Sequence, residues 1–272
     1  MMVYAAGVDI GSRSTECTIL EDGRVVAQDM IGTRPDSEAS AREAFDRALE
    51  RAGLSPERIR FVVSTGYGRV NVPFAGKQVT EILCHGIGAR HLFPNTRTVI
   101  DIGGQDSKGI LLRPANGETK VADFVMNDKC AAGTGRFLEV MAGVLEVDVG
   151  QMGPLSLGST RPIDISSMCT VFAESEVISL IHERRSKEDI ARGLHRSIAI
   201  KVLSIVRKVG IEEEITFTGG VALNSGVVAE MRDVLGLPVN VPEQPQFVGS
   251  LGAALLAWKE ALAGPRNDPV RM

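Results

Sequence analysis

Two short segments of the chain repeat one pattern, and a fold must accommodate both. Asp9-Ile10-Gly11-Ser12 and Asp101-Ile102-Gly103-Gly104 each follow an apolar segment with the character of a β-strand. In each, the strand ends in Asp, the chain turns on glycine, and a second apolar strand follows. Asp22-Gly23 and Asn116-Gly117 then supply dipeptides preferred in two-residue hairpin turns, because both central positions need positive φ. The repetition predicts two similar, duplicated units.

Segments with helical periodicity follow these strand pairs. Residues 37–52 place their apolar side chains on one face, ahead of a strand at residues 60–64. Strands alternating with helices indicate an α/β fold, with a parallel or mixed sheet covered on both faces. The later part of the chain predicts helices over residues 135–145, 171–183, 187–209 and 248–263, and a strand over residues 215–217.

Composition excludes several classes of function. A net charge of -4 and an aromatic content of 4% give no basic, aromatic-rich face for nucleic acid. No apolar run reaches the roughly 18 residues needed to span a bilayer, and the first residues carry no basic flank or cleavage site. We therefore expect a cytoplasmic protein that binds neither nucleic acid nor membrane.

The repeated turns have the chemistry of a phosphate site. Glycine lets backbone amides approach a phosphate chain, and a carboxylate at a strand end can hold the water shell of Mg²⁺. Asp9 and Asp101 suit the second task, with water between the carboxylate and the metal ion. The residues expected around the phosphates are Gly11, Ser12, Arg13, Ser14 and Thr15 in the first turn, and Gly103, Gly104 and Gln105 in the second.

A third glycine turn, Phe217 to Asn224, again ends a strand and opens a helix. Such turns contact nucleotides in α/β proteins. A single turn of this type is more often a tight bend between strands, whereas three together favour nucleotide binding. The residues expected to contact the nucleotide here are Gly219, Gly220, Val221 and Asn224.

The four cysteines fall into two groups. Cys130 and Cys169 each lie in a glycine- or serine-rich segment just before a predicted helix, where backbone N–H groups and the helix dipole favour thiolate. Cys17 lies in a strand and Cys84 in a short apolar stretch, so both are expected in the core. Zinc within one subunit would need His85 or His91, but no Cys-x-x-Cys pair supports it.

These motifs together resemble the actin-like ATPase superfamily, and within it the activators of 2-hydroxyacyl-CoA dehydratases, a family that includes the ATP-binding subunits of benzoyl-CoA reductase. The resemblance implies an α/β, ribonuclease H-like, duplicated two-lobed fold that closes around MgATP. Residues 1–95 would form the first lobe, with a C-terminal helix at 245–264 packing back on it, and residues 96–244 the second. The motifs that carry the resemblance are Asp9–Ser12, Ser64–Arg69, Asp101–Asp106, the Cys130 and Cys169 segments, and Thr218–Ala222.

The resemblance also implies a function. One [4Fe-4S] cluster would be shared by two subunits, with Cys130 and Cys169 as the ligands from each. Four thiolates are the usual ligand set of a cubane, so a homodimer would supply the missing pair. ATP hydrolysis, with Asp9, Asp101 and Gln105 as catalytic residues, would drive one electron from ferredoxin or flavodoxin to an iron–sulfur dehydratase or reductase acting on a CoA thioester.

One position departs from the family. Glu16 stands where many relatives carry a lysine beside the phosphates, which leaves Arg13 as the nearby cation in the first loop. Three alternatives stay open at this point: an ATPase subunit of a heteromeric benzoyl-CoA reductase, an actin-like small-molecule kinase with structural cysteines, and a nucleotide switch without redox chemistry. His182 and His195 fall in predicted helices and are assigned no ligand role.

Overall fold

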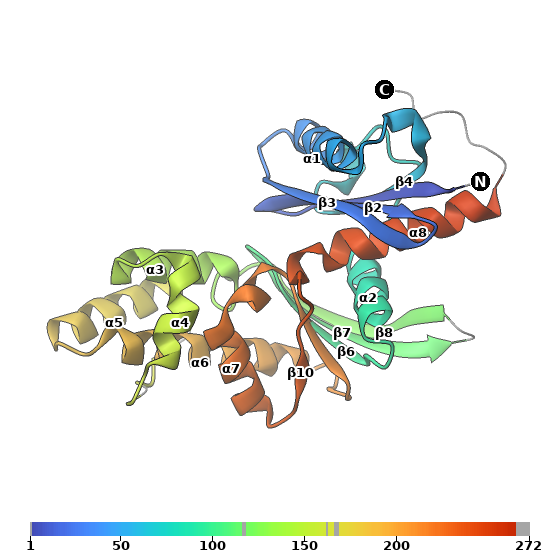
Figure 1. Cartoon of the computed structure of the whole chain (residues 1–272). Helices are drawn as coiled ribbons and strands as arrows, with labels where there is room; N and C mark the ends of the chain where they lie inside the picture. Colours follow the sequence, from blue (N-terminus) through green and yellow to red (C-terminus); the bar gives the residue numbers. More distant parts are fainter. Residues whose placement is uncertain (1, 116–117, 162, 166–168, 265–272) are drawn as a thin grey trace. The chain divides into compact units, whose positions relative to one another are not determined.

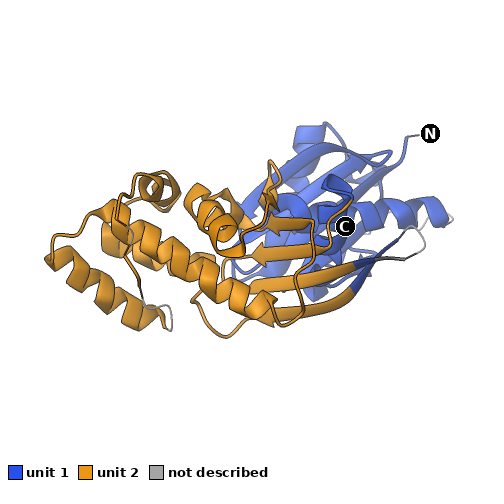
Figure 2. Ribbon diagram, turned by 90° about the horizontal axis from the view of Figure 1, so that it is seen from below, with its two compact units in different colours: residues 1–94, 113–121, 246–272 blue, residues 95–112, 122–245 orange. Residues whose placement is uncertain are grey.

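The chain is an α/β protein built around two five-stranded sheets, as the computed structural model in Figure 1 shows. The structure describes residues 2–115, 118–161, 163–165 and 169–264; the hairpin turn expected at residues 116–117 lies outside these ranges. The chain divides into two compact units, coloured separately in Figure 2. Unit 1 comprises residues 1–94, 113–121 and 246–272, and unit 2 comprises residues 95–112 and 122–245.

Unit 1 is organised around a mixed sheet with the strand order β3-β2-β1-β4-β5. The first three strands form an antiparallel meander, and β4 runs parallel to β1. The meander follows from the Asp22-Gly23 turn, in which both residues have positive φ. The strands are β1 (Tyr4–Ile10), β2 (Ser14–Glu21), β3 (Arg24–Gly32), β4 (Ile59–Gly66) and β5 (Lys77–Gln78).

Helices cover both faces of this sheet. Helix α1 (Ser37–Ala52) starts at Asp36, whose carboxylate accepts from Ala39 N at 3.0 Å, and it ends at Gly53 in the left-handed region. Its buried face packs on β2 and β3, while α8 (Val248–Ala263) packs on β1 and β4 from the other side, backed by α2 (Glu81–Leu92) (Figure 1).

Unit 2 contains the second sheet, with the strand order β10-β9-β6-β7-β8. Strands β6 and β7 are antiparallel, and β9 runs parallel to both β6 and β10. The strands are β6 (Thr98–Ile102), β7 (Ser107–Ala115), β8 (Glu118–Asn127), β9 (Ile215–Thr218) and β10 (Val239–Asn240). The outer part of the β7–β8 hairpin, residues 113–121, groups with unit 1.

The helices of unit 2 share one hydrophobic core with this sheet. Phe137, Phe217 and Ile100 are at most 1% exposed and belong to that core. The longest helix, α6, packs against α4, α5 and α7. The helices are α3 (Gly135–Leu145), α4 (Met152–Leu157), α5 (Thr170–His182), α6 (Lys187–Val206) and α7 (Ser225–Leu235).

The predicted periodicities correspond closely to the observed helices. The predicted spans 37–52, 135–145 and 248–263 match α1, α3 and α8, and the other two predicted helices end within three residues of α5 and α6. Within the described ranges, no helix has both the length and the apolar character required to cross a bilayer.

Candidate functional site: two aspartate–glycine hairpins and a pair of cysteine loops

The repeated sequence pattern forms the same local structure in both units. In unit 1, Asp9 lies at the end of β1 and the turn into β2 is closed by Gly11 N donating to Ser14 O at 2.9 Å. In unit 2, Asp101 lies at the end of β6 and Gly103 N donates to Asp106 O at 3.0 Å. Both aspartates are buried, at 7% and 2% exposure. Each unit therefore holds a carboxylate beneath a glycine turn, the geometry expected of a phosphate loop.

A third strand extends the likeness between the units. Asp9 pairs with Thr65 on β4, and Asp101 pairs with Thr218 on β9, both in parallel register. The glycines that follow, Gly66 and Gly219, both have φ of +84°. A Cβ atom on either glycine would lie 2.4 Å from a backbone oxygen of the neighbouring strand. Only glycine fits at these two turns, a match that the sequence pattern alone does not reveal.

The two aspartates differ in the residue that faces them across the hairpin. Glu16 on β2 pairs with Asp9, whereas Lys108 on β7 pairs with Asp101. The Lys108 side chain is 3% exposed, and its ammonium lies 3.1 Å from Asp101 Oδ2 and 2.9 Å from Asp106 Oδ2. Glu16 stands out in the sequence by itself, whereas Lys108 was not predicted as a site residue. The signal was there, because both residues follow their aspartate by seven positions.

Buried partners fix the orientation of each carboxylate. Asp101 Oδ1 accepts a hydrogen bond of 2.8 Å from the hydroxyl of Thr218. Asp9 Oδ2 lies 3.9 Å from Nε2 of the buried His85 on α2. A Cβ at Gly249 of α8 would lie only 2.0 Å from Asp9 Oδ2, so the start of α8 closes over this carboxylate. Both aspartates are thus held in place from several elements.

The loop residues expected to contact phosphates differ in accessibility. Arg13 and Gln105 are exposed, and the residues flanking them in the expected site are partly exposed. Thr15 is fully buried, and its hydroxyl lies 2.9 Å from that of Thr33, the residue after β3. The accessible members of the two turns are Gly11, Ser12, Arg13, Ser14, Gly103, Gly104 and Gln105.

The third glycine turn leads directly into a helix. Gly219 N donates to Pro245 O at 3.0 Å, and residues Gly220–Leu223 form one turn of 3₁₀ helix before α7. Gly220 is exposed, while Val221 is 5% exposed. The side chain of Asn224 caps α7 by accepting from Gly226 N at 3.0 Å and from Val227 N at 3.1 Å.

The second glycine loop is hydrogen-bonded to the helix that follows Cys130. Gly135 N donates to Gly103 O at 2.9 Å, and Arg136 N donates to Gly104 O at 2.8 Å. These donors belong to the first turn of α3, where backbone N–H groups have no partner within the helix. The glycine loop and the start of α3 therefore form one hydrogen-bonded structure.

The cysteines separate as the sequence suggests. Cys17 and Cys84 are fully buried, and burial raises the pKa of the Cys84 thiol to about 12 and that of Cys17 still further. Cys130 and Cys169 are partly exposed thiols. Cys169 is the N-cap residue of α5, and Cys130 lies four residues before Thr134, the N-cap of α3.

Helix α6 contacts the Cys130 loop and a segment that precedes Cys169 in the sequence. The carboxylate of Asp189 accepts from Ser159 Oγ, Thr160 N and Arg161 N at 2.8–3.1 Å, which anchors the chain segment that leads toward Cys169. Further along α6, Lys201 and Val202 lie 3.3 Å from where a Cβ of Gly133, in the Cys130 loop, would stand. Among the described residues, no group of three or more His, Cys, Asp or Glu side chains is placed to hold a metal ion.

Replacing Asp189 by alanine should loosen residues 159–161. These hydrogen bonds, the backbone N–H of Arg161 foremost, lower the pKa of Asp189 to about 2. Because the folded-state pKa is depressed, the stabilisation is complete above the ordinary carboxyl pKa near 4 and is lost as the pH falls toward 2. Hydrogen exchange at neutral pH should show the amides of Thr160 and Arg161 exchanging roughly tenfold faster in Asp189→Ala.

The matched control is Asp148→Ala, which removes a carboxylate that accepts from Gly150 N at 2.7 Å in another short turn of unit 2. It should leave the exchange of residues 160 and 161 unchanged. Equal exchange in wild type and Asp189→Ala would show that the anchor lies elsewhere.

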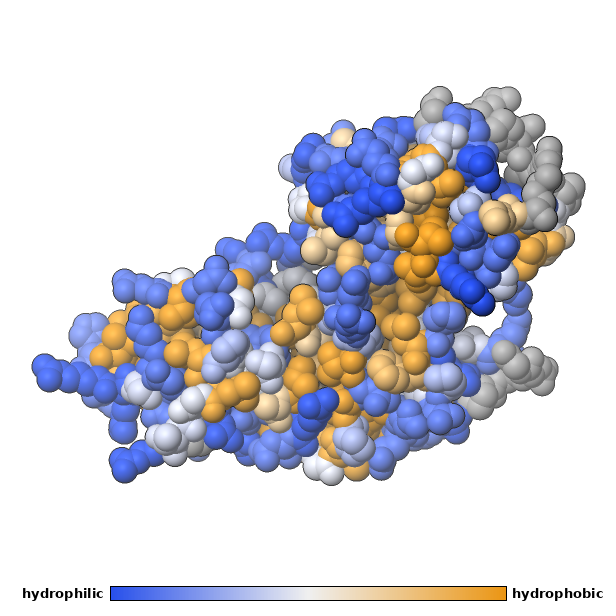
Figure 3. Space-filling model, viewed as in Figure 1, coloured by the Kyte–Doolittle hydropathy of each residue, from blue (hydrophilic) through white to orange (hydrophobic). Residues whose placement is uncertain are grey.

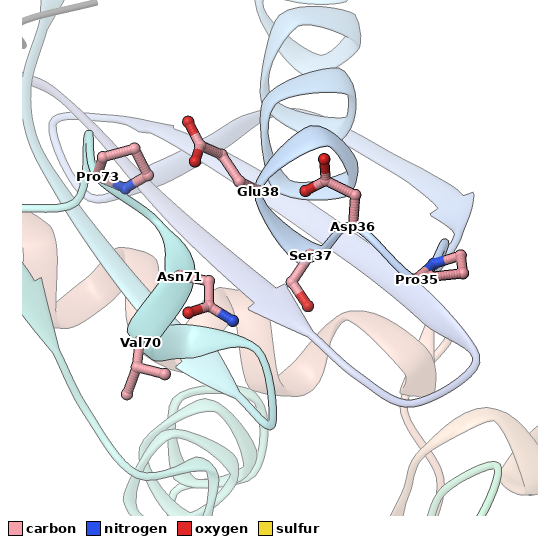
Figure 4. A pocket seen from close by; sticks show the side chains of 7 residues that line it. All are labelled: Pro35, Asp36, Ser37, Glu38, Val70, Asn71 and Pro73. Carbon is pink, nitrogen blue, oxygen red and sulfur yellow. The ribbon is translucent and has the colours of Figure 1, made fainter.

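A surface pocket in unit 1 lies outside the predicted site residues. Figure 4 shows it between the start of α1 and the short turn after β4, with a volume of about 460 Å³. The side chains of Asp36 and Glu38 make its rim acidic, which disfavours phosphate there. Its lining residues are Pro35, Asp36, Ser37, Glu38, Val70, Asn71 and Pro73.

Comparison with known proteins places these features in one family. Over 260 residues the chain is 46% identical to the 2-hydroxyisocaproyl-CoA dehydratase activator of Clostridioides difficile, covering 95% of this chain and 96% of that protein. It is 44% identical to the (R)-2-hydroxyglutaryl-CoA dehydratase activating ATPase of Acidaminococcus fermentans, over 96% of this chain and 99% of that protein. It is also 31% identical to one of the benzoyl-CoA reductase subunits of Thauera aromatica, over 93% of each chain.

Solved structures give the same answer for the fold. The crystal structure of (R)-2-hydroxyglutaryl-CoA dehydratase component A from Acidaminococcus fermentans superimposes with a TM-score of 0.91 and covers 96% of this chain and 99% of that chain. The activator of the 2-hydroxyisocaproyl-CoA dehydratase from Clostridium difficile, solved with bound ADPNP, gives a TM-score of 0.90 at 46% identity and covers 96% of both chains. The actin-like fold expected from the motifs is confirmed. Residues 6–257 match the BadF/BadG/BcrA/BcrD ATPase family, and the chain belongs to that family.

Proposed function

We propose that this protein is an ATP-dependent donor of single, low-potential electrons. It activates an iron–sulfur dehydratase or reductase that acts on an acyl-CoA, and it receives its electrons from ferredoxin or flavodoxin. The relatives named as dehydratase activators support the partner class. The homologue solved with bound ADPNP supports nucleotide binding.

The observation that carries the proposal is the link between the second glycine loop and α3. The carbonyl oxygens of Gly103 and Gly104 accept hydrogen bonds from the first two residues of α3, and Cys130 lies five residues before that helix. A change in the loop on nucleotide binding or hydrolysis would therefore act directly on the segment that carries Cys130. A nucleotide site and a thiol site coupled in this way fit ATP-driven electron transfer.

The thiol pair fits a shared [4Fe-4S] cluster. Cys130, five residues before α3, and Cys169, the N-cap of α5, supply two accessible sulfur ligands, and a second copy of the chain would supply two more. When bound, such a cluster stores and releases one electron. At Cys169 the start of α5 offers backbone N–H groups and a positive dipole end, which would stabilise the thiolate and added negative charge.

The surface next to Cys169 supports a homodimer. Val171 and Phe172, in the first turn of α5, are 65% and 69% exposed. Figure 3 shows hydrophobic residues interspersed with hydrophilic ones on the surface of the helical part of unit 2. Exposed large apolar side chains that cluster at one place mark contact surfaces. A second copy packed around a common cluster would cover them.

For the nucleotide, we propose that Asp9 and Asp101 hold the water shell of Mg²⁺. The accessible loop residues would contact the phosphates, and Gly219, Gly220 and Val221 would contact the nucleoside. Gln105, exposed in the second loop, would position the attacking water, a role that an amide side chain serves in other nucleotide hydrolases.

The test is iron and acid-labile sulfide per chain in anaerobically purified protein, with EPR after dithionite reduction. Wild type should contain about four iron atoms per two chains and one reducible cluster. Cys169→Ala should lose both. Cys84→Ala, which removes a buried thiol in α2, should retain both and serves as the matched control.

Three results would contradict the proposal. Wild-type protein that binds ATP but takes up no iron on anaerobic reconstitution would favour a nucleotide switch or a kinase. Equal iron in Cys169→Ala and wild type would remove Cys169 as a ligand. A monomer with a full cluster would exclude sharing between two copies.

A further inference from the structure

A buried histidine connects three helices behind the third glycine turn. His195, in the middle of α6, is completely buried. Its Nδ1 lies 2.9 Å from Ser156 Oγ on α4, and its Nε2 lies 3.3 Å from Nδ2 of Asn224, the N-cap of α7. A Cβ at Gly226 would come within 2.3 Å of His195 Nδ1, so no side chain fits between α6 and α7 here.

The donor and acceptor groups present determine the direction of each hydrogen bond around His195. The backbone N–H groups of Gly226 and Val227 can only donate, so the atom of the Asn224 amide that faces them is its oxygen. The Asn224 NH₂ group then faces His195, and Nε2 of the histidine must accept. The single imidazole proton is left on Nδ1, where it is donated to Ser156 Oγ.

Ser156 completes the series. Its hydroxyl donates to Gly153 O at 2.8 Å, so its oxygen is available to accept from His195 Nδ1. The series is therefore Asn224 to His195 to Ser156 to Gly153, with each donor matched to one acceptor. Reversing the histidine tautomer would set two N–H donors against each other at Asn224 and leave Ser156 without its donor.

The surroundings keep this imidazole neutral. Burial lowers its pKa to about 4. The charged side chains that link α6 to α7 are Arg192 and Arg196 on α6 and Glu230 and Asp233 on α7, and they form ion pairs of 2.6–3.1 Å. Helix α4, over Met152–Leu157, carries no charged residue. A neutral ring with one acceptor and one donor is what the series requires.

We propose that His195 is a positioning residue for nucleotide binding: as the Nδ1–H tautomer it orients the Asn224 amide, and this fixes the Gly219–Leu223 turn against the start of α7. The inference rests on the proposed nucleotide site. Asn224 ends the turn in sequence, and its backbone N–H also donates to Val221 O at 3.0 Å. Its side chain and backbone therefore hold the turn and the helix together. The same helix, α6, also contacts residues 159–161 through Asp189 and the Cys130 loop through Lys201 and Val202.

Two substitutions test the two ring nitrogens of His195 separately. In His195→Gln the amide oxygen can stand near the former Nε2 and still accept from Asn224. In His195→Asn the shorter amide can stand near the former Nδ1 and donate to Ser156, which leaves Asn224 without its acceptor. The measurement is the calorimetric Kd of the full-length, anaerobically purified protein for MgADPNP and for MgADP, together with Tm without nucleotide.

We expect His195→Asn to bind about tenfold more weakly than wild type and His195→Gln to bind within about threefold of it. Equal affinity in wild type and His195→Asn, or equal weakening in both variants together with equal loss of Tm, would overturn the positioning role. Wild-type protein that binds neither nucleotide would instead overturn the proposed function, and the role of His195 with it.

A second measurement needs no variant to bind nucleotide. Long-range ¹H–¹⁵N spectra report the tautomer of each of the four histidines, and the His195 signals are those that disappear in His195→Gln. The expected result is a neutral Nδ1–H ring from pH 8 to pH 5. An Nε2–H tautomer or a charged ring in that range would overturn the assignment, even if the substituted proteins fail to bind nucleotide.

Discussion

Replacing Lys108 by methionine should destabilise the protein by about 3–5 kcal/mol. The ammonium lies between two buried carboxylates, Asp101 and Asp106, at 3.1 and 2.9 Å. Methionine fills most of the same volume but leaves both carboxylates buried without this cation, and removal of one partner from a buried ion pair is far more costly than loss of the pair. Chemical denaturation monitored by circular dichroism gives the change in the free energy of unfolding.

The matched control is Lys77→Met. Lys77 pairs with Glu260 at 2.6 Å, but both side chains are well exposed. Such surface pairs contribute about 0–1 kcal/mol to stability, so the free energy of unfolding of this variant should be close to that of wild type. Similar losses in the two variants would mean that burial of Lys108 does not govern its contribution.

Lys108→Met should also weaken nucleotide binding. Asp106 Oδ1 would lie 2.6 Å from a Cβ at Gly103, so the carboxylate that pairs with Lys108 supports the glycine of the second loop. Without the cation, Asp106 would turn away from Asp101 and the loop would lose that support. Titration with MgADPNP under conditions where the variant remains folded checks this. Unchanged affinity would show that Lys108 contributes to stability but not to nucleotide binding.

The second large effect concerns two adjacent glycines, of which one has no room for a Cβ atom and the other has ample room. Gly219 has φ of +84°, and a Cβ there would lie 2.4 Å from Ile102 O and 2.8 Å from Asp101 Oδ1. Gly220 has ordinary φ, and a Cβ there would meet no atom within 4 Å. Gly219→Ala should therefore cost about 2–5 kcal/mol of stability, from backbone strain and forced displacement of β6. Gly220→Ala should leave stability within about 0.5 kcal/mol of wild type.

The two glycine variants also test whether the nucleotide binds at this turn. If a nucleoside approaches the backbone at this turn, Gly220→Ala should weaken MgADPNP binding while its Tm stays at the wild-type value. Unchanged binding in a stable Gly220→Ala protein would move the nucleoside contact away from this turn. Unchanged stability in Gly219→Ala would contradict the packing of the turn against β6.

Local sequence patterns predicted much of the secondary structure, but α2 was missed. Helix α2 packs on α8 through small residues: a Cβ at Gly252 would lie 1.8 Å from Cys84 O, and one at Gly88 would lie 2.2 Å from Val248 O. Glycine is a poor helix former, and contact on several sides removes the amphipathic pattern on which the prediction depended. The close approach of the two helices, a tertiary property, explains why these glycines are there.

The sequence by itself determined the two aspartate–glycine hairpins, the third glycine turn, the amphipathic helices and the separation of the cysteines into buried and accessible pairs. Each of these depends on residues within one short segment, where spacing and backbone preference leave few alternatives. Only the tertiary structure decided which side chains complete the site. The matched Gly66 and Gly219, and the series from Asn224 through His195 to Ser156, unite residues far apart in the chain. A local pattern carries no information about such pairings, because they form only when strands and helices pack together.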